Sequence, residues 1–258
     1  MKLIRELYGY RTMMGSLIKR DLIGRYKGSV IGFFWTFLNP LFQLAVYTVV
    51  FTKIMRMGVE DYYLYLFVAL IPWLFFSTCV SGGASCIWAN KDMVNKIYFP
   101  REILPVSFVT SNLINMLLSM LVVLLVLICS GKGINMVALA FLPVVVLIEY
   151  ILALGITLIV SGIAVYFRDM EYILGIVVMA WQFLSPVLYD ISMIPEDMLF
   201  FFNLNPMTPI LTAYRDILYY KQIPHMTTLF HAAVLGLVLL LAGNVSFSRL
   251  KRHFAEEM

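Results

Sequence analysis

The sequence predicts an all-α, polytopic membrane protein, and three properties of the chain lead to that fold class. Of its 258 residues, 62% are hydrophobic and 13% are charged, which is about half the charged share that is usual in soluble domains. The mean hydropathy of +0.89 is too high for a surface that faces water. The apolar stretches are continuous rather than alternating, which favours helices over a membrane β-barrel. A soluble enzyme, a disordered chain and a disulfide scaffold are excluded.

A single transmembrane domain over residues 1–258 is expected to contain six transmembrane helices. A hydrocarbon core of about 30 Å requires roughly 20 mostly apolar residues per helix. The stretches that meet this requirement are about 31–52, 62–87, 103–129, 135–166, 172–189 and 227–247. The fourth stretch is longer than necessary and the fifth is slightly short, so we expect a tilt or a broken end there.

The cations that flank these stretches predict that both termini lie in the cytoplasm. Six spans place both termini on one side, and that side carries 14 Lys and Arg residues, against 5 on the other side. Cytoplasmic segments of membrane proteins are enriched in Lys and Arg. Residues 248–258 are therefore expected to form a cytoplasmic tail.

Residues 1–30 are predicted to form a basic amphipathic helix that lies in the membrane interface. Apolar residues recur there at three- and four-residue steps from Leu3 to Leu22, and Arg and Lys residues fall between them. Such a helix directs its cations toward anionic head groups. An ordinary juxtamembrane anchor is the alternative, whereas a cleavable signal peptide is excluded because no compact apolar core precedes a small-residue cleavage site.

Two connections have unusual compositions. The loop 88–102 is polar and basic, and its centre can form a short cytoplasmic helix that ends before Pro100. The segment 190–226 lies on the opposite side, and it is too apolar for a solvated loop and too interrupted by Pro206 and Pro209 to cross the membrane. Re-entrant or interfacial half-helices fit this segment, because irregular backbone at membrane depth persists only inside protein or beside water.

No catalytic or metal-binding constellation is present in the sequence. The histidines and cysteines lack the spacing of metal ligands, and Gly131-Lys132 is followed by Gly133 instead of completing a P-loop. We expect neither enzymatic activity nor a cofactor in this chain. One ionisable residue, Glu149, lies in the middle of a predicted span. It is either functional, as intramembrane carboxylates often are, or a neutral carboxyl that is hydrogen-bonded between helices.

Aromatic residues make up 15% of the chain, and several lie deeper than the interfacial belt where Trp and Tyr usually occur. A path lined by flat aromatic faces suits sugar rings, because their C–H faces stack on π surfaces. The residues expected to line such a channel are Trp35, Tyr47, Trp181 and Tyr189. Trp181 is the foremost of these because it lies near mid-membrane, and helix packing is the competing interpretation.

Four segments, in order, resemble the membrane subunit of a type-2 ABC exporter of the polysaccharide branch, which exports O-antigen, capsular polysaccharide or teichoic acid. They are LIKRDLIGRYKGSVIGFFWTFLNPLFQL (17–44), NKIYFPREILPV (95–106), VYFRDMEYILGIVVMAWQFLSPVLY (165–189) and NPMTPILTAYRDILY (205–219). In that family these segments are the basic interfacial helix, the coupling helix, the Arg-Asp turn before the fifth span and the extracytoplasmic gate helices. The resemblance extends over nearly the whole chain.

The resemblance implies partners and residue roles. The chain would be the permease subunit in a bacterial cytoplasmic (inner) membrane, paired with a second copy of itself and with two copies of a cytoplasmic ATPase that binds ATP and Mg. Its substrate would be a lipid-linked polysaccharide, and no nucleic acid is expected as a partner. The residues expected at the ATPase are Asn90, Lys91, Asp92, Lys96, Arg168 and Asp169. Those expected in the gate are Asn205, Pro206, Pro209, Tyr214 and Arg215. Those expected to meet the diphosphate head group of the substrate are Arg20, Arg25 and Lys27.

Two alternatives stay open at this point. A type-2 ABC exporter of a drug, lipid or haem shares the architecture, but a narrower and less aromatic path is expected for it. A non-transporting membrane scaffold or enzyme subunit belongs to a different class. Genes for an ATPase and for glycosyltransferases beside this one would favour polysaccharide export.

Overall fold

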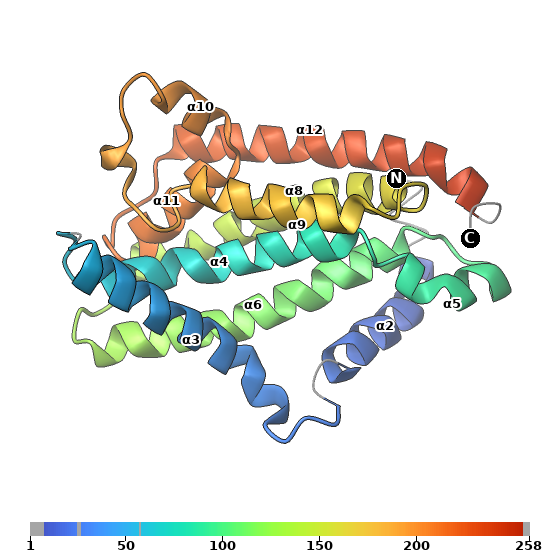
Figure 1. The fold of residues 1–258 in the computed structure, drawn as a ribbon, viewed down its shortest axis with the longest axis horizontal. Coiled ribbons are helices and arrows are strands. Elements are labelled where there is room, and N and C mark those ends of the chain that lie inside the picture. Colours follow the sequence, from blue (N-terminus) through green and yellow to red (C-terminus); the bar gives the residue numbers. More distant parts are fainter. Residues whose placement is uncertain (1–7, 25–26, 57, 255–258) are drawn as a thin grey trace.

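The computed structural model describes residues 8–24, 27–56 and 58–254, and over these residues the chain forms helices and no strands (Figure 1). Arg25 and the apolar positions 3–7 lie outside the described residues, so their expected roles stay predictions. The helices are α2 (Arg11–Gly24), α3 (Trp35–Val49), α4 (Tyr62–Gly83), α5 (Lys91–Lys96), α6 (Ile103–Cys129), α7 (Met136–Leu139), α8 (Leu142–Ala164), α9 (Met170–Phe183), α10 (Leu199–Leu204), α11 (Met207–Leu218) and α12 (Met226–Leu250).

Within the described chain, five helical stretches are long and apolar enough to cross a membrane. They are Gly32–Ile54, Tyr62–Gly83, Ile103–Cys129, Met136–Ala164 and Met226–Leu250. The fourth is broken between α7 and α8, and the fifth predicted stretch contains only the 14-residue helix α9. The irregularity expected at these two stretches is confirmed, while the count of six crossings stays a prediction.

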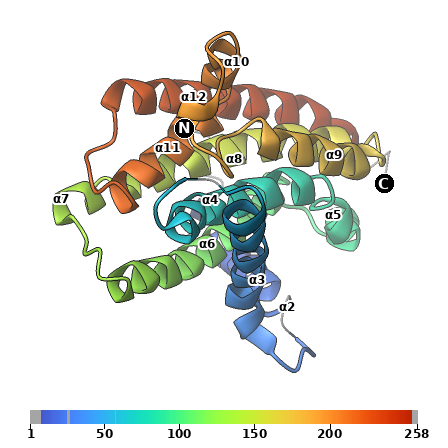
Figure 2. The same ribbon diagram turned by 60° about the vertical axis from the view of Figure 1, so that its left-hand side comes forward.

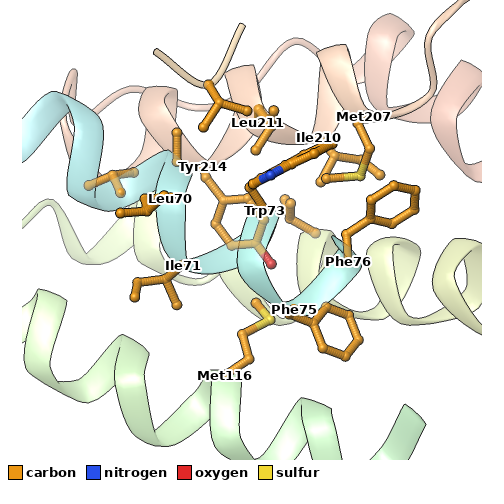
Figure 3. Packing of buried hydrophobic residues seen from close by; sticks show 14 of the residues in the cluster. Leu70, Ile71, Trp73, Phe75, Phe76, Met116, Met207, Ile210, Leu211 and Tyr214 are labelled. Atoms are coloured by element: carbon orange, nitrogen blue, oxygen red, sulfur yellow. The ribbon is translucent and has the colours of Figure 1, made fainter. Parts of the chain in front are cut away.

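Helix α4 forms the centre of the bundle. It packs against α3, α6, α8, α9 and α11, and 78% of its most apolar stretch is buried, compared with 17–33% for the other helices that could span. A helix that is apolar all round occurs in a protein core or in a membrane span, and α4 is covered mainly by other helices. Figure 3 shows its side chains reaching two neighbours, with Trp73 directed toward α11 and Phe75 toward Met116 of α6.

Helices α8 and α12 lie side by side because glycines permit a close approach of their backbones. A Cβ added to Gly243 would lie 2.4 Å from the carbonyl oxygen of Gly155, and a Cβ added to Gly155 would lie 2.6 Å from the backbone nitrogen of Leu240. Small residues at an interface between membrane helices allow such proximity, and van der Waals packing then stabilises the pair. This pair forms one long side of the bundle (Figure 1).

The two ends of the bundle differ in what they carry. One end, here the α5 end, contains α5, the turn 165–169 and the last residues of α12, and α2 packs there against α6 (Figure 1). The opposite end, here the α11 end, contains α7, α10 and α11 (Figure 2). Leu17 of α2 is buried among apolar residues at the α5 end, while Arg11, Lys19 and Arg20 are exposed. Leu17 and the three cations thus lie on different sides of α2, while an amphipathic helix in the membrane interface stays a prediction.

The two unusual connections contain the short helices that the sequence predicts. Helix α5 ends at Lys96, and the chain is extended at Ile97, before Pro100. In the segment 190–226, α10 and α11 are separated by Asn205 and Pro206. Whether α10 and α11 are re-entrant stays a prediction.

Candidate functional site

At the α5 end, Trp88 joins two segments that lie far apart in the sequence. Its indole Nε1 donates a hydrogen bond to the carbonyl oxygen of Ala164, at 3.2 Å, where α8 ends. The guanidinium of Arg168 lies 4.3 Å from the centroid of the indole ring, and Nζ of Lys91 lies 5.1 Å from it. Cations attract the faces of aromatic rings. Both segments predicted to meet an ATPase are thus held together on one surface.

The other residues predicted at this surface leave their charges exposed. Asp92 and Lys96 form an ion pair of 3.8 Å across one turn of α5, but both side chains are more than 75% exposed. Such a pair contributes little to stability, so both groups are open to a partner protein. Asp169 is also exposed, at the beginning of α9.

The predicted head-group site and the predicted ATPase site are in contact with each other. Arg20, expected to meet the substrate head group, donates a hydrogen bond to the side-chain oxygen of Asn90, expected at the ATPase. The amide nitrogen of Asn90 in turn donates to the carbonyl oxygen of Cys86, at 2.8 Å. Helix α2 is therefore tied to the segment that precedes α5. Lys27 follows α2 and is exposed.

At the α11 end, the buried guanidinium of Arg215 binds the chain that follows α9. Its Nη1 donates to the carbonyl oxygen of Pro186, at 2.6 Å, and its Nη2 donates to that of Val187, at 2.8 Å. The guanidinium also lies 3.7 Å from the centroid of the Tyr65 ring. These carbonyls have no helical partner, and charged donors form strong hydrogen bonds. Arg215 thus fixes α11 to the irregular segment after α9 and to α4.

Asp190 completes this cluster. Its side chain accepts hydrogen bonds from the Tyr65 hydroxyl, at 2.8 Å, and from the backbone nitrogen of Ser192, at 2.9 Å. Partial burial alone would raise the pKa of Asp190, but these hydrogen bonds and the charge of Arg215 hold it below its usual value. The cluster therefore contains a carboxylate and a guanidinium, whose charges offset each other.

Asn205 connects the end of α9 to the beginning of α11. Its side-chain oxygen accepts from the indole nitrogen of Trp181, at 2.9 Å, and from the backbone nitrogen of Met207, at 3.0 Å. Its amide nitrogen donates to Leu184 and Ser185. Both of its polar atoms are thus used within the protein. The break between α10 and α11 is fixed by these bonds, and Pro206 then begins α11, with Pro209 in its first turn.

The four aromatic residues predicted to line a channel occupy different places. Trp35 lines a cavity of about 380 Å³ between α3, α4 and α6, and Trp181 lines a separate, mainly apolar cavity of about 560 Å³. Tyr47 is half-buried against the core, and the Tyr189 hydroxyl donates to the carbonyl oxygen of Phe183. The edge-to-face contact of Trp181 with Phe76, at 5.1 Å, also gives this residue a packing role.

Glu149 has a partner in the segment predicted to form the gate. The Tyr214 hydroxyl donates to its side-chain oxygen Oε2, at 2.6 Å, and both residues are fully buried. This contact agrees with the interpretation of Glu149 as a hydrogen-bonded carboxyl between helices. It joins the middle of α8 to α11.

Sequence reasoning did not single out Trp88, Tyr65 or Asp190. One feature of the sequence could have identified Trp88, because it is an aromatic residue at the start of a polar, basic loop. Nothing in the local sequence indicates that Tyr65 and Asp190 meet Arg215, because the three residues come from distant parts of the chain.

Residues 13–219 match the family model described as ABC-2 type transporter. The chain is 39% identical over 259 residues to the O-antigen export system permease protein RfbA of Myxococcus xanthus, a match that covers 100% of this chain and 99% of the relative. It is 28% identical over 240 residues to a protein of that name from Klebsiella pneumoniae, covering 93% and 92% of the two chains. It is also 25% identical over 237 residues to the polysialic acid transport protein KpsM of Escherichia coli, covering 90% and 91%.

Proposed function

Because this chain belongs to the ABC-2 type transporter family, we propose that it is the permease subunit of an ATP-driven exporter of a lipid-linked polysaccharide. The observation that carries the proposal is the full-length similarity to relatives named for O-antigen export and polysialic acid transport. These names favour a polysaccharide over a drug, a lipid or haem. The chain is a transporter subunit rather than an enzyme.

The proposed complex contains two copies of this chain and two copies of a cytoplasmic ATPase, with the α5 end in the cytoplasm of a bacterial cell. The contacts of Trp88 with Lys91 and Arg168 support this arrangement. They bring two segments that are distant in the sequence onto one surface, where a single partner can bind both. Closure of the ATPases would displace this surface, and Trp88 would pass the displacement to α4 and α8 as a rigid-body motion.

The substrate path is proposed to lie partly between the two copies. The stretch that contains α3 is only 17% buried in a single chain, although it carries Trp35 and Tyr47. A face of this kind suits contact with a second copy or with a glycan that stacks on aromatic rings. The diphosphate head group would meet cations near α2, since Arg20, Arg25 and Lys27 offer the charge that phosphate oxygens bind.

The first test is biochemical. The purified chain alone is expected to hydrolyse no ATP, because its sequence contains no P-loop, whereas its complex with a partner ATPase is expected to do so. Cells that lack the gene should accumulate polysaccharide inside. Expression of this chain together with its ATPase should restore polysaccharide at the cell surface, as detected with a lectin or antibody. Hydrolysis by the isolated chain, or normal surface polysaccharide without it, would contradict the proposal.

Reversal of the exposed charge at Asp169 tests the proposed ATPase surface. In Asp169→Arg, a like charge placed against a complementary partner should cost several kcal/mol. Export is therefore expected to fall about tenfold or more, with the ATPase either released from the membrane or hydrolysing without transport. The matched control is Asp197→Arg, which reverses an exposed carboxylate at the α11 end and should leave assembly and export unchanged. Equal export by the two variants would argue against an ATPase contact at Asp169.

A further inference from the structure

The cavity between α3, α4 and α6 combines polar and aromatic groups on one side of an apolar bundle. Its volume of about 380 Å³ lies within the range of small-molecule sites. None of the described residues that line it carries a charge. The amide and hydroxyl groups that line it belong to Thr36, Asn39, Thr78, Asn112, Asn115 and Ser119, and Trp35 and Phe75 add aromatic rings.

Part of this polar lining has a structural task. Pro40 lies inside α3 and has no N–H, so the carbonyl of Thr36 lacks the donor that a helix would normally supply. The Ser119 hydroxyl of α6 reaches across and donates to that carbonyl, at 3.4 Å. The amide nitrogen of Asn112 donates to the carbonyl oxygen of Phe108, at 2.8 Å. These two groups are satisfied in the folded chain.

Asn115 lacks such a partner. It lies near the middle of α6, and its side-chain oxygen is buried without a hydrogen bond to any described residue. An unpaired polar atom at membrane depth is costly. Polar residues in membrane spans therefore usually face a cavity where a substrate or water completes their hydrogen bonds.

We propose that this cavity binds a sugar unit of the transported glycan, with the amide of Asn115 bound to its hydroxyl groups and the ring of Trp35 stacked on its C–H face. The inference rests on the proposed function and assigns one site on the path. Neutral amides and hydroxyls match the donors and acceptors of a sugar. Because the described lining residues include no cation, the lining suits a neutral sugar better than the diphosphate head group.

Trp35 is placed for this task. It lines the cavity and is 42% exposed in the single chain, and α3 diverges from α6 toward α2 (Figure 1). A side chain that served helix packing alone would be covered by neighbouring helices.

Variants at Asn115 in the complete exporter test the site. Asn115→Leu keeps the branched outline of the side chain, although it is larger, and removes the amide. We expect surface polysaccharide to fall about threefold to tenfold, the loss that corresponds to one or two hydrogen bonds. Asn115→Gln retains the amide and should recover most of the export. The matched control is Leu121→Met, which changes an exposed apolar residue of α6 outside the lining of the cavity and should export normally.

A labelling experiment separates a binding role from a structural one. Asn115→Cys is introduced into a chain whose exposed Cys129 is replaced by Ser, since Cys79 and Cys86 are buried. A water-soluble methanethiosulfonate should label it in cells that make no glycan, and labelling should fall several-fold in cells that make glycan but carry a hydrolysis-deficient ATPase. Equal labelling in both, or no labelling in either because a second copy seals the cavity, would overturn the inference.

The two levels of the proposal fail in different ways. If the unaltered chain restores surface polysaccharide but Asn115→Leu does so equally well, the sugar site is wrong and the exporter assignment stands. If the unaltered chain with its ATPase restores none, the proposed function itself is wrong.

Discussion

Replacement of Arg215 by Met is expected to lower the free energy of unfolding by about 3–5 kcal/mol, the range found when one partner of a buried charged cluster is removed. The carbonyls of Pro186 and Val187 would lose their donors, and Asp190 would keep a carboxylate without its countercharge. Thermal unfolding of the detergent-solubilised complex measures the loss. Surface polysaccharide should fall with it, because α11 would no longer be fixed to the segment after α9.

Two further variants show whether the geometry of the guanidinium matters. Arg215→Lys keeps the charge but cannot bond both carbonyls with a planar fork, so its stability should lie between that of the Met variant and that of the unaltered chain. Lys53→Met removes an exposed cation at the same end of the bundle and should be neutral. If Arg215→Met unfolds at the same temperature as Lys53→Met, the cluster does not hold this end together.

Substitution of Gly243 by Val is expected to prevent the close packing of α8 and α12. Its Cβ would lie 2.4 Å from the carbonyl oxygen of Gly155, and a backbone atom cannot rotate away as a side chain can. Overpacking usually lowers the free energy of unfolding by about 1–3 kcal/mol. Because the contact here is with backbone, we expect a loss at or above the upper end of this range for Gly243→Val. We expect little monodisperse protein after solubilisation. Even Gly243→Ala should lower the unfolding temperature by several degrees.

The matched control for this prediction is Gly175→Ala on α9. A Cβ at Gly175 meets nothing within 4 Å, and Gly-to-Ala changes in helices tend to stabilise by about 0.4–1 kcal/mol when there is room. Its yield should equal or exceed that of the unaltered chain. Similar yields from Gly175→Ala and Gly243→Val would show that α8 and α12 do not pack through their glycines.

The helices were predictable because the length and continuity of the apolar stretches reflect a bilayer of fixed thickness. The short helices α5, α10 and α11 were predictable for a different reason, since proline and polar residues interrupt those segments. The end of α9 was harder to place. The apolar stretch continues to Tyr189, but the helix stops at Phe183, shortly before Pro186 removes a backbone donor.

The contacts that build the candidate site could not be predicted in the same way. Arg215 has an ordinary local sequence, and its burial depends on carbonyls that become available only when the chain turns after α9. The stacking of Arg168 on Trp88 likewise depends on how α4 packs against α8. Local sequence patterns predict individual helices. The contacts of Arg215 and Trp88 depend instead on how helices that are distant in the chain pack together.

The bond between Glu149 and Tyr214 has a consequence for biosynthesis. The two residues are 65 positions apart, so at about 5–20 residues per second α8 leaves the ribosome several seconds before its donor exists. An acidic residue such as Asp at the centre of a span raises the free energy of membrane insertion by about 2.5–3.5 kcal/mol, and each Leu, Ile or Val lowers it by roughly 0.3–0.6 kcal/mol. The many apolar residues of α8 are sufficient for entry, but a nascent chain that stops before α11 retains an unpaired carboxyl in the lipid. The carboxyl of Glu149 therefore gains its donor only after α11 has been made, when α12 is the one long helix still to be synthesised among the described residues.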